Sequence, residues 1–288
     1  MRKIMIVVLA FLLGGCSINQ TRRYFIDPKY YLNVDGSTVT IPLAEAVRAA
    51  ITRQTIEEVR PYVLHTKTHQ AYVNLINKKV DLIFVTSPSA EELDLAKKAK
   101  VELEIIPIVS EAFVFLTNKD NPIDSLTIDQ IQRIYTGEYT NWKQVGGNDM
   151  PIKAFQRPIN SGSQTGFLEL VMKNKIPMEA PIEMMPAGMD ELIERVAVFD
   201  NTSDAIGYSY YYYVTDMWVN TNVKLIKVNG ILPTSATIQD NSYPIHTAYY
   251  AVIRKDEMIG SQARRIIDFI LSKEGQQLME DAGYVKVK

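Results

Sequence analysis

The sequence is poor in cysteine, in histidine and in charge of one sign, and each shortage excludes a class of protein. Its 288 residues contain one cysteine, Cys16, so no disulfide framework can hold the fold together. The three histidines lack metal-ligand spacing and form no recognisable group with carboxylates, which argues against a metal site. A formal net charge of −2 without a basic tract argues against nucleic acid as a partner.

Long hydrophobic runs are also scarce, since only residues 4–13 form a continuous apolar run that approaches the length and hydrophobicity of a membrane-spanning helix. Two basic residues precede this run, and small residues follow it up to Cys16. The run is too short for a permanent membrane span, so the pattern predicts a cleaved lipoprotein signal peptide over residues 1–15. We expect lipid attachment at Cys16, a polar tether over residues 16–31, and a mature protein anchored at the outer face of the cytoplasmic membrane.

The clearest chemical signal lies in residues 155–167, which read FQRPINSGSQTGF. Arg157 supplies a fixed positive charge, and Ser161 and Ser163 supply hydroxyl donors. Gly162 lets the backbone come close to a ligand. Apolar residues at helical spacing follow, so the run is expected at a helix N-terminus, whose free N–H groups attract anions. The stretch predicts an oxyanion site; taken alone, it would equally suit an ordinary N-cap and loop.

Two more loops rich in hydroxyl groups precede predicted helices. Residues 36–42 combine Gly-Ser-Thr with a proline suited to a first helical turn, and residues 65–70 contain Thr68, which can cap the next helix. After the second loop, residues 81–85, which are continuously apolar from Leu82 onward, predict a buried strand that ends at a Thr-Ser pair containing Ser87. Ligands bind at such strand ends in open α/β sheets. Strand and helix signals alternate along the chain, which predicts an α/β fold with largely parallel sheets.

Patterns in the C-terminal half predict further elements. Apolar spacing predicts helices over residues 189–198 and 261–282, and Asp190 suits the positive start of the first of these. The tyrosine run at residues 210–213 could form an aromatic platform for a sugar or a peptide. Side chains on a strand alternate between faces, so core packing with one exposed face is the favoured interpretation.

Five segments along the chain form a recognisable set: Gly36-Ser37-Thr38, Asn141-Trp142 with Gly146-Gly147, Arg157 with Ser161-Gly162-Ser163, Ala205-Ile206-Gly207-Tyr208, and Gly283-Tyr284-Val285. In order and spacing, these motifs resemble those of phosphate-binding lipoproteins, the substrate-binding components of phosphate-type ABC importers. The resemblance implies a type II periplasmic-binding-protein fold, with two α/β lobes of mainly parallel sheets joined by two crossover hinge segments. Lobe one would comprise residues 32–113 plus 249–288, and lobe two residues 114–248.

The resemblance also implies the ligand contacts and the function. The ligand-binding positions would be Thr38, Val39, Thr68, Ser87, Arg157, Ser161, Gly162 and Ser163. They would hold inorganic phosphate, or a similar tetrahedral oxyanion, between the lobes for delivery to ABC permease subunits. The protein would act as a monomer, without a metal or cofactor and without enzymatic activity. The family tends to place an acidic residue beside Ser87, where a carboxylate can accept a hydrogen bond from protonated phosphate, and its absence here leaves selectivity against sulfate open.

Three other interpretations remain open. Ser161 or Ser163 could be a nucleophile with His69 as its base, although no Gly-x-Ser-x-Gly elbow is present. The protein could bind sulfate or another small ligand. It could also be a lipoprotein that has lost transport and serves as a sensor or adhesion factor.

Overall fold

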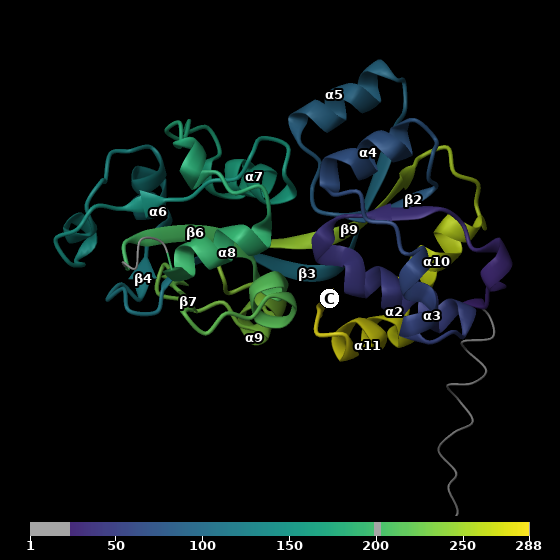
Figure 1. The fold of residues 1–288 in the computed structure, drawn as a ribbon. Coiled ribbons are helices and arrows are strands. Elements are labelled where there is room, and N and C mark those ends of the chain that lie inside the picture. Colours follow the sequence, from purple (N-terminus) through teal and green to yellow (C-terminus); the bar gives the residue numbers. More distant parts are fainter. Residues whose placement is uncertain (1–23, 199–202, 288) are drawn as a thin grey trace, which may run out of the picture.

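The computed structural model describes residues 24–198 and 203–287. The predicted signal peptide and Cys16 lie outside these residues. Two lobes lie on either side of a pair of long strands, β3 (Leu103–Asn118) and β9 (His246–Arg254), which extend between them (Figure 1). Here lobe one denotes the part with β1, β2 and α2–α5, and lobe two the part with β5, β6 and α6–α9.

Most strands belong to one eight-stranded sheet, ordered β1-β2-β9-β3-β6-β5, with β7 and β10 also paired to β3. A separate two-stranded sheet joins β4 and β8. The remaining strands are β1 (Val34–Gly36), β2 (Leu82–Val85), β4 (Ser125–Leu126), β5 (Lys153–Ala154), β6 (Ala205–Tyr210), β7 (Val223–Leu225), β8 (Lys227–Val228) and β10 (Val285–Lys286). β3 pairs with β9 from Leu103 to Ala112 and with β6 from Phe113 to Thr117, so one strand serves both lobes.

The strand pairing corrects one expectation. β1–β2, β5–β6 and β4–β8 are parallel, but every pair that includes β3 or β9 is antiparallel. The α/β class is confirmed, whereas the expected predominance of parallel pairs is wrong. The reason lies in the crossovers: the chain leaves lobe one along β3 and returns along β9, so these strands run in opposite directions through the middle of the sheet.

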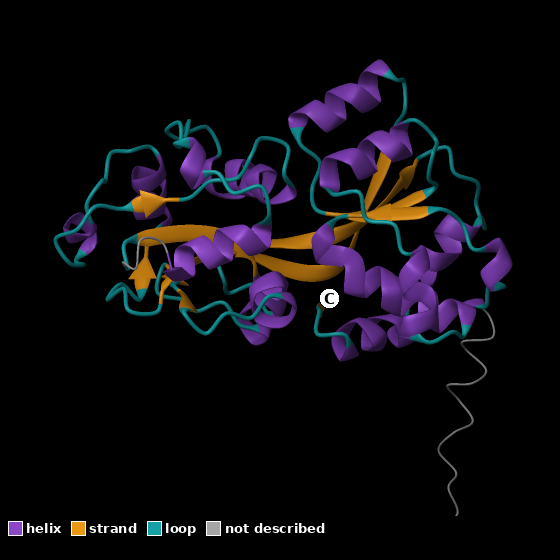
Figure 2. Cartoon of the chain, viewed as in Figure 1, coloured by secondary structure: helices purple, strands orange, loops and turns teal. Residues whose placement is uncertain are grey.

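Helices cover the strands in both lobes (Figure 2). They are α2 (Ile41–Thr52), α3 (Ile56–Val59), α4 (Thr68–Ile76), α5 (Ala90–Lys98), α6 (Ile128–Tyr135), α7 (Gly162–Gly166), α8 (Met189–Val198), α9 (Ser235–Gln239), α10 (Gln262–Leu271) and α11 (Lys273–Asp281). The helix predicted over residues 189–198 is confirmed as α8. The long helix predicted over 261–282 is instead two helices, because Ser272 is extended and accepts the Gly275 N–H as the cap of α11. Within the two described ranges, none of the helices has the length and apolar character needed to cross a membrane.

The first described residues pack on lobe one. The Tyr24 ring lies 5.4 Å from that of Phe269 on α10, and the Ile26 N–H donates to the Ile51 carbonyl at the end of α2. Ile26 is 4% exposed. The predicted tether over residues 16–31 is therefore wrong for residues 24–31, because aromatic and aliphatic side chains within this largely polar segment bury apolar surface against the lobe.

An aromatic cluster holds the segment that follows α7 in the core of lobe two. The Phe167 ring stacks on that of Tyr208 from β6, with centroids 4.6 Å apart and planes 7° apart. Tyr135 of α6 and Phe115 of β3 surround the same pair. Phe167 begins a π-helical stretch, Phe167–Met172, which continues directly from α7. Burial of these rings therefore holds the C-terminal end of α7 against the sheet.

Candidate anion-binding site

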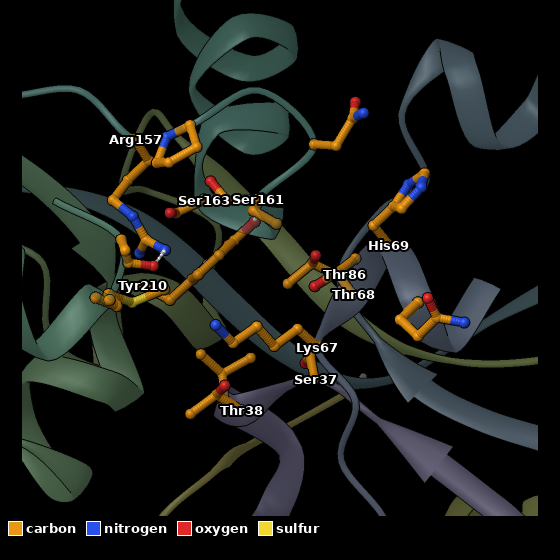
Figure 3. A pocket seen from close by; sticks show the side chains of 18 of the residues that line it. Ser37, Thr38, Lys67, Thr68, His69, Thr86, Arg157, Ser161, Ser163 and Tyr210 are labelled. Carbon is orange, nitrogen blue, oxygen red and sulfur yellow. Dashed lines mark hydrogen bonds between the residues drawn. The ribbon is translucent and has the colours of Figure 1, made fainter. Parts of the chain in front are cut away.

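A cavity of about 630 Å³ is lined by residues of both lobes (Figure 3). Lobe one contributes a 3-10 turn, Thr38–Thr40, together with the start of α4 and the end of β2. Lobe two contributes the loop before α7, the start of α8 and two tyrosines. Seven of the eight predicted ligand-binding residues line this cavity: Thr38, Val39, Thr68, Arg157, Ser161, Gly162 and Ser163. Residues from three distant parts of the sequence, each in a loop before a helix, thus meet in one cavity.

Ser87 is the exception. Its neighbour Thr86, which is 2% exposed, lines the cavity, whereas Ser87 is not among the lining residues. Successive side chains of an extended segment point to opposite sides, so only one of the two can face the ligand. The structure therefore brings Thr86, rather than Ser87, together with the other predicted residues. The sequence alone does not show which side of the strand end faces lobe two.

Arg157 is held firmly without an acidic partner. Its Nε and Nη2 donate to the carbonyls of Pro186 and Ala187, at 2.9 and 2.7 Å. Its backbone N–H donates to the Tyr208 hydroxyl at 2.9 Å. The residue is 8% exposed, and no carboxylate of the described chain lies within 4.0 Å of its guanidinium. Burial lowers the pKa of Arg157, because the charged form loses hydration. A buried guanidinium that forms no ion pair with a carboxylate of the described chain favours binding of an anion.

The loop before α7 presents hydroxyl groups beside this charge. Ser161 caps α7 by accepting the Gln164 N–H at 3.2 Å. The Ser163 hydroxyl is buried and makes no hydrogen bond to any residue that the structure describes. Such an orphan group is costly unless a ligand or water satisfies it. Ser163 therefore presents an unused donor to whatever occupies the cavity.

Gly162 lies where the loop of lobe two comes close to lobe one. A Cβ atom at this position would lie 2.5 Å from Thr68 Oγ1 and 2.6 Å from Thr86 Oγ1. The Tyr210 hydroxyl donates to the Gly162 carbonyl at 2.9 Å, which fixes the glycine from the other side. Only glycine lets the loop of lobe two come this close to the threonines of lobe one.

Asp35, the middle residue of β1, positions the loop of lobe one that precedes α4. This carboxylate is 1% exposed and accepts hydrogen bonds from the Thr66 N–H at 2.9 Å and the Thr66 hydroxyl at 2.6 Å. Asn74 of α4 donates to it at 2.8 Å. The start of α4, with Thr68 and its free N–H groups, is thereby fixed at the cavity wall.

Several lining residues were missed by the sequence analysis as ligand-binding residues. They are Lys67, His69, Thr86, Asp190, Tyr210 and Tyr213. Asp190 was noted only as an acidic residue at a helix start, and the tyrosines were assigned to packing. Tyr210 and Tyr213 are 2% and 4% exposed, so packing is confirmed, yet both also border the cavity. These residue types are able to contact an anion, but the sequence does not show which of their side chains point into the cavity.

Comparison with known proteins identifies the family. A family model described as the PBP superfamily domain matches residues 26–274. The phosphate-binding protein PstS of Borreliella burgdorferi is 22% identical, over 98% of this chain and 99% of that protein. PstS of Bacillus subtilis is 28% identical, over 69% of this chain and 62% of that protein.

Solved structures agree with this assignment. A putative phosphate ABC transporter substrate-binding protein from Clostridium perfringens, with bound phosphate, has a TM-score of 0.66 at 28% identity and covers 89% of this chain and 99% of its own. An ABC-type phosphate transport receptor from Vibrio cholerae has the same fold, with a TM-score of 0.65 at 21% identity over 88% and 99% of the two chains. Since the family model spans most of the sequence, this chain belongs to the PBP superfamily, as its motifs predicted.

Proposed function

We propose that this protein captures inorganic phosphate between its lobes and delivers it to an ABC permease. The observation that carries the proposal is Arg157, a buried cation without a carboxylate partner among the described residues, in a cavity lined by hydroxyl groups of both lobes. The 28%-identical structure from Clostridium perfringens, described with bound phosphate, supports phosphate as the ligand. No metal or cofactor is required by this arrangement.

The proposed contacts are energetically sufficient. Micromolar affinity corresponds to about −8 kcal/mol. Each hydrogen bond to a charged group contributes roughly 1.5–3 kcal/mol. The hydroxyl groups of Thr38, Thr68, Ser161 and Ser163, the amide of Val39 and the guanidinium of Arg157 can together supply six or more such bonds. Their sum exceeds the requirement even after the entropic cost of association and lobe closure.

Asp190 favours phosphate over sulfate as the ligand. Asp190 lines the cavity near Arg157, and a carboxylate there can accept a hydrogen bond from a protonated oxyanion. Sulfate has no proton to donate, so it would form no hydrogen bond with the carboxylate and would be repelled by its negative charge. In this proposal, Asp190 supplies the acidic group that the sequence lacks beside Ser87.

The lobe boundaries are part of the proposal, with lobe one as residues 32–113 plus 249–288 and lobe two as 114–248. The change of partner along β3, from β9 at Ala112 to β6 at Phe113, supports a hinge there. Closure around the anion would then create the surface that the permease recognises. We also propose a monomer that is lipidated at Cys16 after removal of residues 1–15 and held at the outer face of the cytoplasmic membrane.

A role without catalysis fits the site better than hydrolysis. The His69 ring contacts the Glu92 carboxylate at 3.1 Å, and no hydrogen bond in the described structure joins His69 to Ser161 or Ser163. A nucleophile needs its base within hydrogen-bond reach. We therefore propose binding and release of the anion as the whole of the function.

Calorimetric titration tests the proposal. The chain from Ser17 onward would be freed of bound anion by unfolding and refolding, and then titrated with phosphate and with sulfate. We expect phosphate binding, a loss of at least 100-fold in affinity for Arg157→Ala, and no loss for Arg133→Ala, a half-buried arginine on α6 outside the cavity. Wild-type protein that bound neither anion would refute the function, and unchanged affinity in Arg157→Ala would refute the site.

A further inference from the structure

The residue before α4 has a backbone conformation that side chains disfavour. Lys67 has φ +72° and ψ 164°, a region occupied almost only by glycine. Its neighbours enforce this conformation: Thr66 is tied to Asp35 by two hydrogen bonds, and the Lys67 carbonyl accepts the Ala71 N–H at 3.0 Å as α4 begins. A glycine would satisfy all of these backbone contacts with less strain. A lysine at this place therefore needs a reason other than stability.

The side chain of Lys67 supplies that reason. It lines the same cavity as Arg157 and reaches into it from lobe one (Figure 3). No acidic side chain of residues 24–198 or 203–287 forms an ion pair with its ammonium group. Lys67 is exposed and its structural bonds are made by its backbone, so removal of the ammonium group leaves the local fold intact.

The two cations come from opposite lobes. Arg157 belongs to lobe two and Lys67 to lobe one. The other charged or titratable side chains that line the cavity in the described structure are His69, Asp190, Tyr210 and Tyr213. Two like charges that face one cavity repel each other, and the repulsion grows as the lobes approach and water leaves. A doubly charged oxyanion between them turns this repulsion into two attractions.

We propose that Lys67 is a second cationic ligand of the anion, by which the site selects a doubly charged tetrahedral oxyanion. This inference rests on the proposed function and deepens it. The ammonium group, as a compact point charge on a long flexible stem, reaches the anion from lobe one, while Arg157 binds it from lobe two. The strained backbone at Lys67 is maintained because it aims this side chain at the ligand.

Three variants of Lys67 test the proposal by calorimetry with inorganic phosphate at pH 8 and by thermal unfolding without phosphate. Lys67→Gly removes both the strain and the charge, so we expect a higher Tm together with at least tenfold weaker phosphate binding. Lys67→Gln removes only the charge and should weaken binding equally at an unchanged Tm. Lys67→Arg keeps the charge and should bind within about threefold of wild type.

Lys78→Gly is the matched control. Lys78 also has a positive φ, +59°, but lies outside the cavity. Its replacement should raise the Tm without changing phosphate affinity. If wild-type protein binds phosphate and Lys67→Gly binds it equally well, this inference fails while the proposed function stands. If Lys67→Arg binds as weakly as Lys67→Gln, the charge is not the cause and the inference also fails.

Discussion

Glu111 provides a sharp test of the energetics at the junction of the lobes. It lies on β3 just before that strand changes partner from β9 to β6, and it is 2% exposed. Its carboxylate accepts the N–H of Ala112 at 2.7 Å and, more weakly, that of Tyr212 at 3.4 Å. No cationic side chain in the described residues pairs with it. Burial raises the pKa of Glu111 to about 7, although the hydrogen bonds act in the opposite direction.

The sign and size of the effect on stability follow from this pKa. In the unfolded chain the carboxyl titrates near 4.5, so between pH 4.5 and about 7 the folded protein retains a proton that the unfolded chain has lost. The free energy of unfolding contributed by Glu111 is therefore fully present below pH 4.5 and is lost as the pH rises through 7. With about 1.4 kcal/mol for each pH unit, the total loss is about 3 kcal/mol.

Urea unfolding of wild type and Glu111→Gln at pH 5 and pH 8, followed by the fluorescence of the buried Trp142, measures this loss. Glutamine accepts the same N–H groups and does not titrate. We expect the stability of wild type relative to Glu111→Gln to fall by about 2 kcal/mol between the two pH values. Glu183→Gln, at an exposed position, should show no such change. Parallel pH profiles for wild type and Glu111→Gln would show that the reasoning about burial is wrong.

Three further substitutions probe the site and the core. Gly162→Ala places a Cβ 2.5 Å from Thr68 Oγ1, which blocks closer approach of the lobes. Phosphate affinity should therefore fall at least tenfold at a nearly constant Tm. Calorimetry that shows wild-type affinity would count against lobe closure at this point. Asp190→Asn should admit sulfate, which titration of the variant with sulfate would detect, and continued exclusion of sulfate would remove Asp190 from the selectivity argument. Arg254→Met leaves two buried backbone carbonyls without their donor and should lower the free energy of unfolding by about 3 kcal/mol, and a urea midpoint equal to that of wild type would contradict this.

Local patterns in the sequence determined much of the site. The Ser-Gly run at residues 161–163 opens a helix as predicted, because the Ser161 hydroxyl caps α7 through a contact three residues away. The helix α8 matches its predicted bounds, since apolar periodicity and the acidic start at Asp190 are both local signals. Order and spacing of such motifs were sufficient to predict the family and the fold class.

The tertiary structure alone decided how these segments meet. The antiparallel pairing of β3 depends on partners at least 89 residues away in the sequence, so no local pattern could show it. The choice of Thr86 over Ser87, and the entry of Lys67 and Asp190 into the cavity, depend on which side of each element faces the opposite lobe. Likewise, the guanidinium of Arg157 is held by carbonyls about 30 residues further along the chain. A sequence specifies which side chains are available, whereas the packing of distant segments determines which of them share a cavity and with what charge.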